Sequence, residues 1–217
     1  MLYIVATPIG NLKDISLRAI EVLKDVDLIA CEDTRHTKIL LDHYGIKTPT
    51  TSFYQQNRFV KAGYIISLLK EGKDIALVSD AGTPGILDPG YNLINLAIKN
   101  NIQITVIPGP CALINALVLS GKPTHRFIFL GFLPRHSQAR RNQLKRLADL
   151  DMTIVFYESS HRIVATLKDI NEIFKDKELV CCRELTKRFE EIMRGNADQL
   201  LEVFKEKRPR GEFVVLI

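Results

Sequence analysis

The chain has 217 residues, of which 46% are hydrophobic and 25% are charged, so its composition is that of an ordinary globular protein with one large or two small domains. Its 30 basic and 25 acidic residues give a net charge of +5, which permits a nucleic-acid partner without requiring one. No apolar run approaches the roughly 20 residues that span a bilayer, and this argues against a membrane partner. The four cysteines have neither metal-ligand nor disulfide-framework spacing, so we expect no metal site and a reducing, cytoplasmic location.

Strand and helix patterns alternate through the first half of the chain. Short apolar runs typical of strands lie at residues 2–6, 28–31, 50–53, 75–78 and 102–107. Helical patterns lie at residues 16–24, 37–44, 58–71, 91–99 and 113–119. This alternation predicts an α/β domain with a largely parallel sheet that helices cover on both faces.

The second half repeats this mixture after a break at residues 120–123, where the helical pattern stops. Strands are predicted at residues 126–132, 153–157, 179–182, 189–194 and 212–217. Helices are predicted at residues 137–147, 162–174 and 197–205. We therefore expect two α/β domains, 1–120 and 121–217. The last strand is apolar and has no polar tail, so either it is tucked into a sheet or the chain was cut from a longer protein.

The organising stretch is IALVSDAGTPGILDPG at residues 75–90. A buried strand runs into a loop whose glycines and prolines exclude a continuous helix or strand. Asp88 is a suitable N-cap and Pro89 a suitable first residue for the helix that follows. The loop carries one acid before that cap, Asp80, and no cation, which favours a neutral or cationic ligand over a triphosphate. The alternative is a tight crossover turn whose glycines serve only the backbone.

Three loops in the first half combine glycine and proline directly after a predicted strand: TPIGN, SDAGTPG and PGPCA. Each follows a predicted strand, so in a parallel sheet all three lie at the carboxyl edge and can converge on one ligand. The motifs G-x-G-x-x-G and G-x-x-x-x-G-K-[ST] are absent, as are a serine nucleophile elbow and H-E-x-x-H. The loops therefore predict a polar-ligand site that is not a dinucleotide or P-loop site.

Seven segments occur in an order that identifies a family: TPIGNLKDISLRA, ACEDTRHT, SDAGTPGILDPG, PGPCAL, GFLP, VFYESSHR and CRELTKRFEE. With them the chain resembles the tetrapyrrole-methylase-like class of S-adenosylmethionine-dependent methyltransferases over residues 2–217. Within that class it is similar to the enzymes that methylate a cytidine ribose 2'-hydroxyl in small-subunit (16S) ribosomal RNA. The resemblance implies two α/β domains with S-adenosylmethionine in the cleft between them, a homodimer, and ribosomal RNA or the small ribosomal subunit as partner.

The resemblance also implies which residues bind the methyl donor. In the first half they are Pro8, Ile9, Gly10, Ser79, Asp80, Ala81, Thr83, Cys111 and Ala112. In the second half they are Tyr157, Glu158 and Leu185. Two positions depart from the family pattern, because Cys111 replaces a serine and Ser160 a proline. The first departure exchanges a hydroxyl donor near the cofactor for a weaker thiol.

Three residues are candidates for the chemistry. Glu32 matches the position of a catalytic acid in tetrapyrrole methylases and is our candidate general base, although a solvated surface acid would look the same. Arg35, with His36, is a candidate grip for a phosphate. Lys187 is a weaker candidate that would face the cleft, the alternative being a solvated lysine.

The segment at residues 135–146, RHSQARRNQLKR, holds five cations and no acid. Four of them fall at helical spacing and are our candidates for RNA-backbone contact: Arg140, Arg141, Lys145 and Arg146. The alternative is a solvated helix face. For the whole chain, two other functions remain open: methylation of a small tetrapyrrole-like substrate, and non-catalytic RNA binding with a vestigial cofactor fold.

Overall fold

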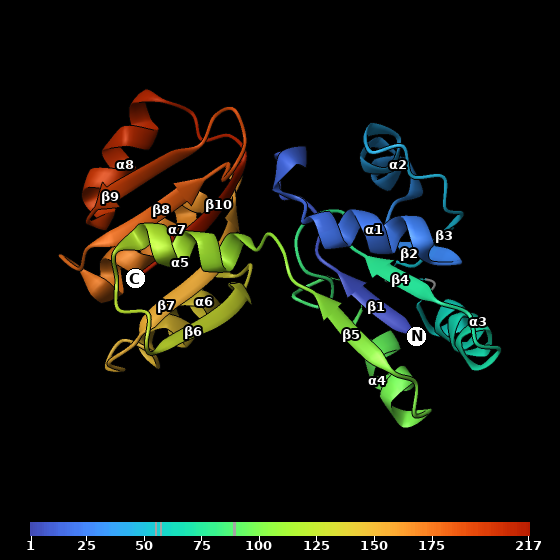
Figure 1. The fold of residues 1–217 in the computed structure, drawn as a ribbon. Coiled ribbons are helices and arrows are strands. Elements are labelled where there is room, and N and C mark those ends of the chain that lie inside the picture. Colours follow the sequence, from blue (N-terminus) through green and yellow to red (C-terminus); the bar gives the residue numbers. More distant parts are fainter. Residues whose placement is uncertain (55, 57, 89) are drawn as a thin grey trace. The chain divides into compact units, whose positions relative to one another are not determined.

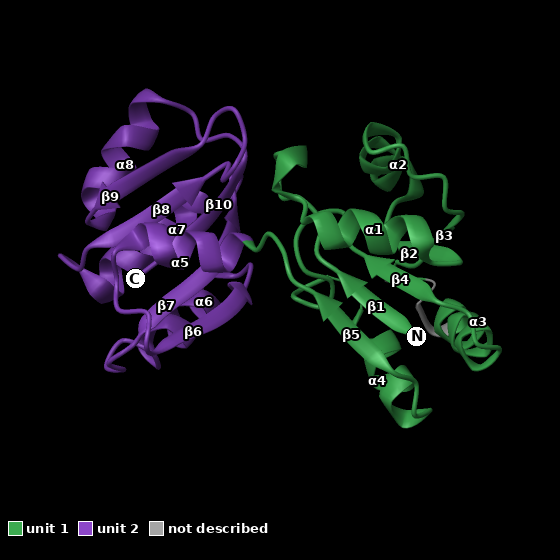
Figure 2. Ribbon diagram, viewed as in Figure 1, with its two compact units in different colours: residues 1–111 green, residues 112–217 purple. Residues whose placement is uncertain are grey.

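The computed structural model describes residues 1–54, 56, 58–88 and 90–217 (Figure 1). The chain forms two compact units, residues 1–111 and 112–217 (Figure 2). The division lies between Cys111 and Ala112 and thus differs from the predicted boundary after Ser120. The helix α5 (Ala112–Ser120) causes this difference, because it packs against strands of the second unit.

The first unit is built on a five-stranded sheet with the order β3-β2-β4-β1-β5. Its strands are β1 (Leu2–Val5), β2 (Leu28–Cys31), β3 (Thr50–Ser52), β4 (Ile75–Val78) and β5 (Ile104–Ile107). Every neighbouring pair is parallel, which confirms the sheet predicted from the alternation of strands and helices. All the carboxyl ends of these strands therefore lie at one edge.

Helices cover both faces of this sheet, because successive residues of a strand point to opposite sides. The helices of the first unit are α1 (Leu17–Asp25), α2 (Thr34–His43), α3 (Arg58–Lys70) and α4 (Tyr91–Lys99), with a short 3-10 helix at Leu12–Asp14. In β4, Ala76 and Val78 pack in a core with α1 and α2. The alternate residues Ile75 and Leu77 pack in a second core with α3 and α4.

The start of α2 and the N-cap of α4 differ from the prediction. Helix α2 begins at Thr34, three residues before the predicted start, because the Asp33 side chain caps it by accepting the Arg35 backbone N–H at 2.8 Å. Asp88 is not the N-cap of α4: Gly90 holds that position without a side-chain cap, and Asp88 forms a hydrogen bond with Ser79 instead. The prediction for Pro89 lies outside the described residues.

The second unit has a mixed sheet with the order β6-β7-β10-β8-β9. Its strands are β6 (Phe127–Phe132), β7 (Thr153–Ser159), β8 (Leu179–Arg183), β9 (Glu191–Gly195) and β10 (Glu212–Leu216). Only the pair β6–β7 is parallel, and the other three pairs are antiparallel. The apolar last strand β10 lies between β7 and β8, which confirms that it is tucked into a sheet.

The core of the second unit lies between this sheet and the helices α6 (Ser137–Lys145), α7 (Ile163–Phe174) and α8 (Ala197–Glu206). Leu144, Leu167 and Leu200 supply one buried side chain from each helix. Across the described part of the chain, no helix is both long enough and apolar enough to cross a membrane.

Candidate functional site

The loops that follow β1 and β4 are hydrogen-bonded to each other at the carboxyl edge of the first sheet. Thr7 and Gly82 form an antiparallel bridge, with the Thr7 N–H donating to the Gly82 carbonyl at 2.9 Å and the Gly82 N–H donating back at 3.0 Å. The Thr7 hydroxyl donates to the Ser79 carbonyl at 3.0 Å. These contacts hold Pro8, Ile9 and Gly10 beside the loop that carries Asp80.

The loop after β5 meets the other two at Gly82. A Cβ atom on Gly82 would lie 3.5 Å from the Ile9 side chain and 3.8 Å from the Pro110 carbonyl oxygen. The φ of Gly82 is +80°, a left-handed conformation that glycine adopts without strain. The predicted convergence of the three loops is therefore confirmed within the first unit.

The predicted donor-binding residues of the first unit surround this meeting point and offer mostly backbone groups. Pro8 and Ser79 are buried, and the Ser79 hydroxyl donates to the Ala81 and Gly82 carbonyls at 3.3 and 3.4 Å, so it stabilises the turn. The three loops contain no lysine or arginine. A site of amides, carbonyls and small apolar side chains suits a neutral or cationic ligand better than a polyphosphate.

Glu32 stands at the carboxyl end of β2 among other acids. Partial burial raises its pKa above the ordinary 4.5, and the nearby carboxylates of Asp80 and Asp88 raise it further. Asp80 is fixed in place because its carboxylate accepts the Asp33 backbone N–H at 3.1 Å. A carboxylate with a raised pKa is a better proton acceptor at neutral pH than a fully solvated one, which suits a general base.

Arg35 is engaged by its own neighbour. Its guanidinium donates to the Asp33 carboxylate at 2.7 and 3.1 Å, and these hydrogen bonds hold the pKa of Asp33 well below its usual range. The Arg35 side chain is otherwise exposed on the first turn of α2, as is His36. Their predicted role as a phosphate grip remains a prediction.

The candidates in the second unit are held by contacts within that unit. The Glu158 carboxylate is buried and accepts the Thr166 hydroxyl at 2.7 Å and the Ser159 backbone N–H at 2.8 Å. The Tyr157 ring lies edge-on to the ring of Phe129, with centroids 4.9 Å apart. Leu185 is buried in the loop after β8. Their contact with the donor, like that of Ala112 at the start of α5, remains a prediction.

Lys187 is paired with two acids, which makes it a poor candidate for proton transfer. Its ammonium lies 3.0 Å from the Glu184 carboxylate and 2.9 Å from that of Glu212. Burial alone would lower the pKa of Lys187, but the hydrogen bonds to Glu212 and Glu184 raise it. These ion pairs tie Lys187 to Glu184 and to β10, and its role in the chemistry remains a prediction.

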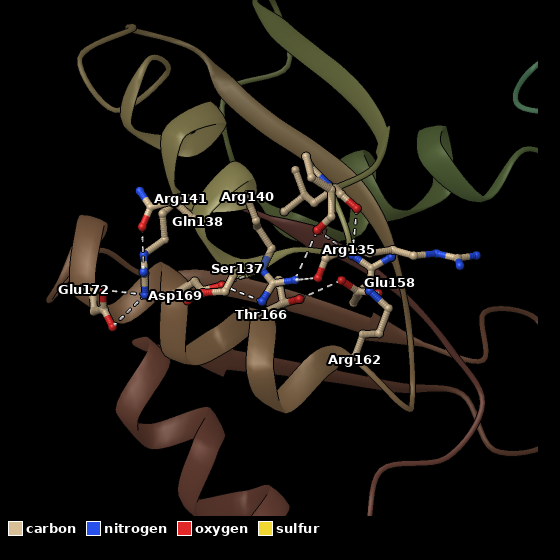
Figure 3. A network of polar contacts seen from close by, with 12 residues as sticks. Arg135, Ser137, Gln138, Arg140, Arg141, Glu158, Arg162, Thr166, Asp169 and Glu172 are labelled. Carbon is tan, nitrogen blue, oxygen red and sulfur yellow. Dashed lines mark hydrogen bonds and ion pairs between the residues drawn. The ribbon is translucent and has the colours of Figure 1, made fainter.

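The structure corrects the predicted RNA contact at Arg140. This side chain is buried, with the residue 3% exposed, and its Nε donates to the Asp169 carboxylate at 2.6 Å (Figure 3). Arg141 is also engaged, 3.2 Å from Glu172 and 3.4 Å from Asp169. Lys145 and Arg146 are exposed near the end of α6, as predicted for surface cations.

Sequence reasoning missed Asp33 and Asp88 as neighbours of the site, and Thr7 as the residue that joins two of its loops. The sequence could have indicated Asp33, because it directly follows Glu32 after a strand and stands in the N-cap position before a helix. No local pattern indicated the contacts of Thr7 and Asp88, because their partners Gly82 and Ser79 lie 75 and 9 residues away along the chain.

Comparison with known proteins shows which family this chain belongs to. The family model described as Tetrapyrrole (Corrin/Porphyrin) Methylases matches residues 1–201. Curated relatives named "Ribosomal RNA small subunit methyltransferase I" align with the whole chain. The relative from Thermotoga maritima is 48% identical over 216 residues and is covered to 97% of its length. That from Hydrogenobaculum sp. is 49% identical and covered to 94%, and that from Escherichia coli O157:H7 is 47% identical and covered to 77%.

Solved structures agree with the fold. A diphthine synthase superposes with a TM-score of 0.78 at 16% identity, covering 100% of this chain and 88% of the other. A cobalt precorrin-4 methyltransferase superposes with a TM-score of 0.72 at 18% identity, covering 99% of this chain and 93% of the other. At such low identities, the superpositions establish the architecture alone.

Proposed function

We propose, from the premise that this chain belongs to the tetrapyrrole (corrin/porphyrin) methylase family, that it is an S-adenosylmethionine-dependent methyltransferase of small-subunit ribosomal RNA. The acceptor we propose is the ribose 2'-hydroxyl of a cytidine in 16S RNA. The observation that carries the proposal is alignment over the whole of this chain at 46–50% identity with relatives named "Ribosomal RNA small subunit methyltransferase I". Such a substrate would place the protein in the cytoplasm, where its free cysteines also remain reduced.

The meeting point of the three loops is the proposed donor site. S-adenosylmethionine carries a sulfonium, a carboxylate and an adenine, so it needs backbone donors and acceptors and apolar walls more than a phosphate cradle. Ile9 and Gly10 supply one wall, Asp80 to Thr83 the middle, and Cys111 the third side. Tyr157 and Leu185 of the second unit are proposed to complete the site.

The residues at this edge would act mainly by alignment. When bound, the donor supplies a methyl group on a sulfonium that departs as a neutral thioether. Holding the ribose oxygen in line with that carbon supplies much of the rate, because bound reactants no longer have to meet. Glu32, whose raised pKa brings it closer to neutral pH, would take the hydroxyl proton on a carboxylate oxygen.

The test is methyl transfer from radiolabelled S-adenosylmethionine to small ribosomal subunits, naked ribosomal RNA or a tetrapyrrole, each incubated with the purified protein. Label in the RNA of the subunits supports the proposal, and mapping the labelled nucleotide tests the cytidine assignment. Label in the tetrapyrrole alone would reassign the enzyme to small-molecule methylation. Donor binding without transfer to any acceptor would favour a non-catalytic RNA-binding protein.

Glu32→Gln tests the base directly. We expect unchanged donor affinity by calorimetry and turnover lowered about 100-fold, because general-base catalysis contributes factors of that order. The matched control is Glu21→Gln, which alters an exposed acid on α1. Wild-type turnover in Glu32→Gln would leave Glu32 without a catalytic role.

A further inference from the structure

The loop that follows β6 presents an aromatic ring to solvent on a rigid support. Phe132 ends β6 and is 56% exposed, although Gly131 directly before it is buried. The pairing of β6 with β7 shifts register between Phe129 and Phe132, and Gly131 has a φ of +65° at this irregularity. Bulges of this kind re-aim a side chain, and here the re-aimed side chain is Phe132.

Other rings brace Phe132 from within the second unit. The Tyr157 ring on β7 lies edge-on to it, with centroids 5.9 Å apart and planes at 70°. Tyr157 in turn packs edge-on against Phe129, at 4.9 Å. The three rings form a small aromatic cluster whose exposed member is Phe132.

Two arginines hold the residues directly after Phe132. The Arg162 guanidinium donates to the Leu133 carbonyl at 2.7 Å and to the Pro134 carbonyl at 3.1 Å. The Arg140 guanidinium donates to the Pro134 carbonyl at 3.2 Å and to the Arg135 carbonyl at 3.3 Å (Figure 3). Three successive carbonyls of a surface loop are therefore turned inward and fixed.

Two buried carboxylates hold these arginines in turn. Asp169 on α7 pairs with Arg140, and Glu158 on β7 lies 3.4 Å from the Arg162 Nε. Burying charges is costly unless they are paired, and here each arginine is paired with a buried carboxylate. The geometry that results is a rigid loop at residues 132–136.

The charged side chains of this loop and of the following helix that lie outside the network are basic. The Arg135 side chain extends away from the other labelled residues (Figure 3). Three peptide links separate Phe132 from Arg135, so their Cα atoms lie at most about 11 Å apart. Exposed Lys145 and Arg146 follow on α6, and residues 131–148 contain no acid.

We propose that the loop at residues 132–136 is a contact site for single-stranded RNA, in which an unpaired base stacks on Phe132 and the adjacent phosphate pairs with Arg135. An exposed ring beside cations, with no acid in the segment, fits unpaired nucleotides, since each has a base to stack and a phosphate to neutralise. Arg140 and Arg162 are then positioning residues that act through the loop. This inference rests on the proposed function, whose RNA substrate it supplies with a binding element.

The test measures binding of a fluorescent single-stranded oligoribonucleotide of small-subunit sequence to the full chain by anisotropy. Phe132→Ala should weaken binding about tenfold, and Phe132→Trp should restore it, because stacking on an aromatic side chain contributes a factor of that order. Arg135→Ala should lower the slope of log affinity against log salt by about one unit, whereas Arg135→Lys should keep it. Binding of a perfect RNA duplex should change little in Phe132→Ala, since its bases are not free to stack.

The matched control is Phe127→Ala, which removes a ring 39% exposed at the other end of β6 and should leave RNA affinity unchanged. Wild-type RNA affinity in Phe132→Ala would overturn the inference, and so would equal losses for single strand and duplex. An equal loss of S-adenosylmethionine binding in Phe132→Ala would also overturn it, by assigning the ring to the donor site. Because the binding assay involves no methyl transfer, its outcome is separate from failure of the proposed activity.

Discussion

At the scale of single residues, neighbours brought in by the fold decide what a side chain can do. Glu32 follows a strand as many surface acids do, yet its surroundings raise its pKa. Lys187 and Arg140 are cations for which the sequence suggested functional roles, and each is paired with acids within its own unit. The first kind of environment prepares a group for chemistry, and the second removes a group from it.

The raised pKa of Glu32 predicts a pH dependence of stability. Between the ordinary pKa of 4.5 and the raised value, the folded protein retains a proton on Glu32 that the unfolded chain has lost. The contribution of Glu32 to stability is therefore present at low pH and is lost as the pH rises through this window. Glu32→Gln should raise the melting temperature at pH 7 and leave it nearly unchanged at pH 4. An equal shift at both pH values would show that ionisation of Glu32 is not the cause.

The buried pair of Arg140 and Asp169 predicts a large loss of stability in Arg140→Ala. Asp169 is only 4% exposed in the folded protein and would lose its main partner, and breaking a buried pair from one side costs about 3 kcal/mol or more. Urea unfolding measures this loss in the free energy of unfolding. Arg146→Ala is the control, because Arg146 is exposed and should change the free energy of unfolding by no more than about 0.5 kcal/mol. Similar small effects in both variants would contradict the buried network.

At the scale of elements, the functional features lie where strands end. The loops after β1, β4 and β5 meet at Gly82 because a parallel sheet brings its carboxyl ends to one edge. In the second unit, the loop after β6 is fixed by the side chains of Arg140 on α6 and of Arg162, the residue before α7. In both units regular elements position an irregular segment, which is how loops obtain defined geometry.

Gly82→Ala tests whether the meeting point of the loops depends on the glycine. The left-handed φ of +80° costs an alanine about 1–2 kcal/mol, although its Cβ would meet Ile9 at an ordinary 3.5 Å. We expect a free energy of unfolding lower by about that amount and weaker S-adenosylmethionine binding by calorimetry. Gly63→Ala is the control: Gly63 is exposed on α3 with open space around it, so alanine should stabilise the helix by about 0.5–1 kcal/mol. Unchanged donor affinity in Gly82→Ala would place the donor elsewhere.

At the scale of the whole molecule, two α/β units of similar size differ in the way their sheets are built. The first sheet is entirely parallel and is covered by helices on both faces. The second is mostly antiparallel, and α5 packs against its strands β7, β8 and β10. Helix α5 leaves apolar side chains exposed, among them Val118 at 71%.

We expect the protein to be a homodimer, as the family resemblance predicts and as the exposed apolar side chains of α5 favour. Exposed apolar side chains that cluster on one element are typical of an interface. Sedimentation at micromolar concentration should give about twice the mass of the 24.6 kDa chain. Val118→Asp should shift the equilibrium toward the monomer if α5 is part of the contact. A monomer of wild-type protein at all concentrations tested would contradict the prediction.

Much of this protein follows from local sequence. Short apolar runs separated by glycine, proline and capping residues determine where strands and helices lie, because backbone propensity and burial period act within a few residues. The alternation of the two determines the parallel first sheet, and hence the edge at which its loops converge. The ordered motifs determine the family, which the alignment with residues 1–201 confirms.

Only the tertiary structure decided the rest, because it depends on contacts between residues far apart in the chain. Helix α5 belongs to the second unit since its apolar side chains are buried against β10, nearly a hundred residues later. The antiparallel order of the second sheet arises from strand pairings that no local pattern records. Arg140 differs from its exposed neighbours only because α7 places Asp169 beside it. Burial and pairing follow from such long-range packing, and they separate a cation that can meet RNA from one that holds the fold together.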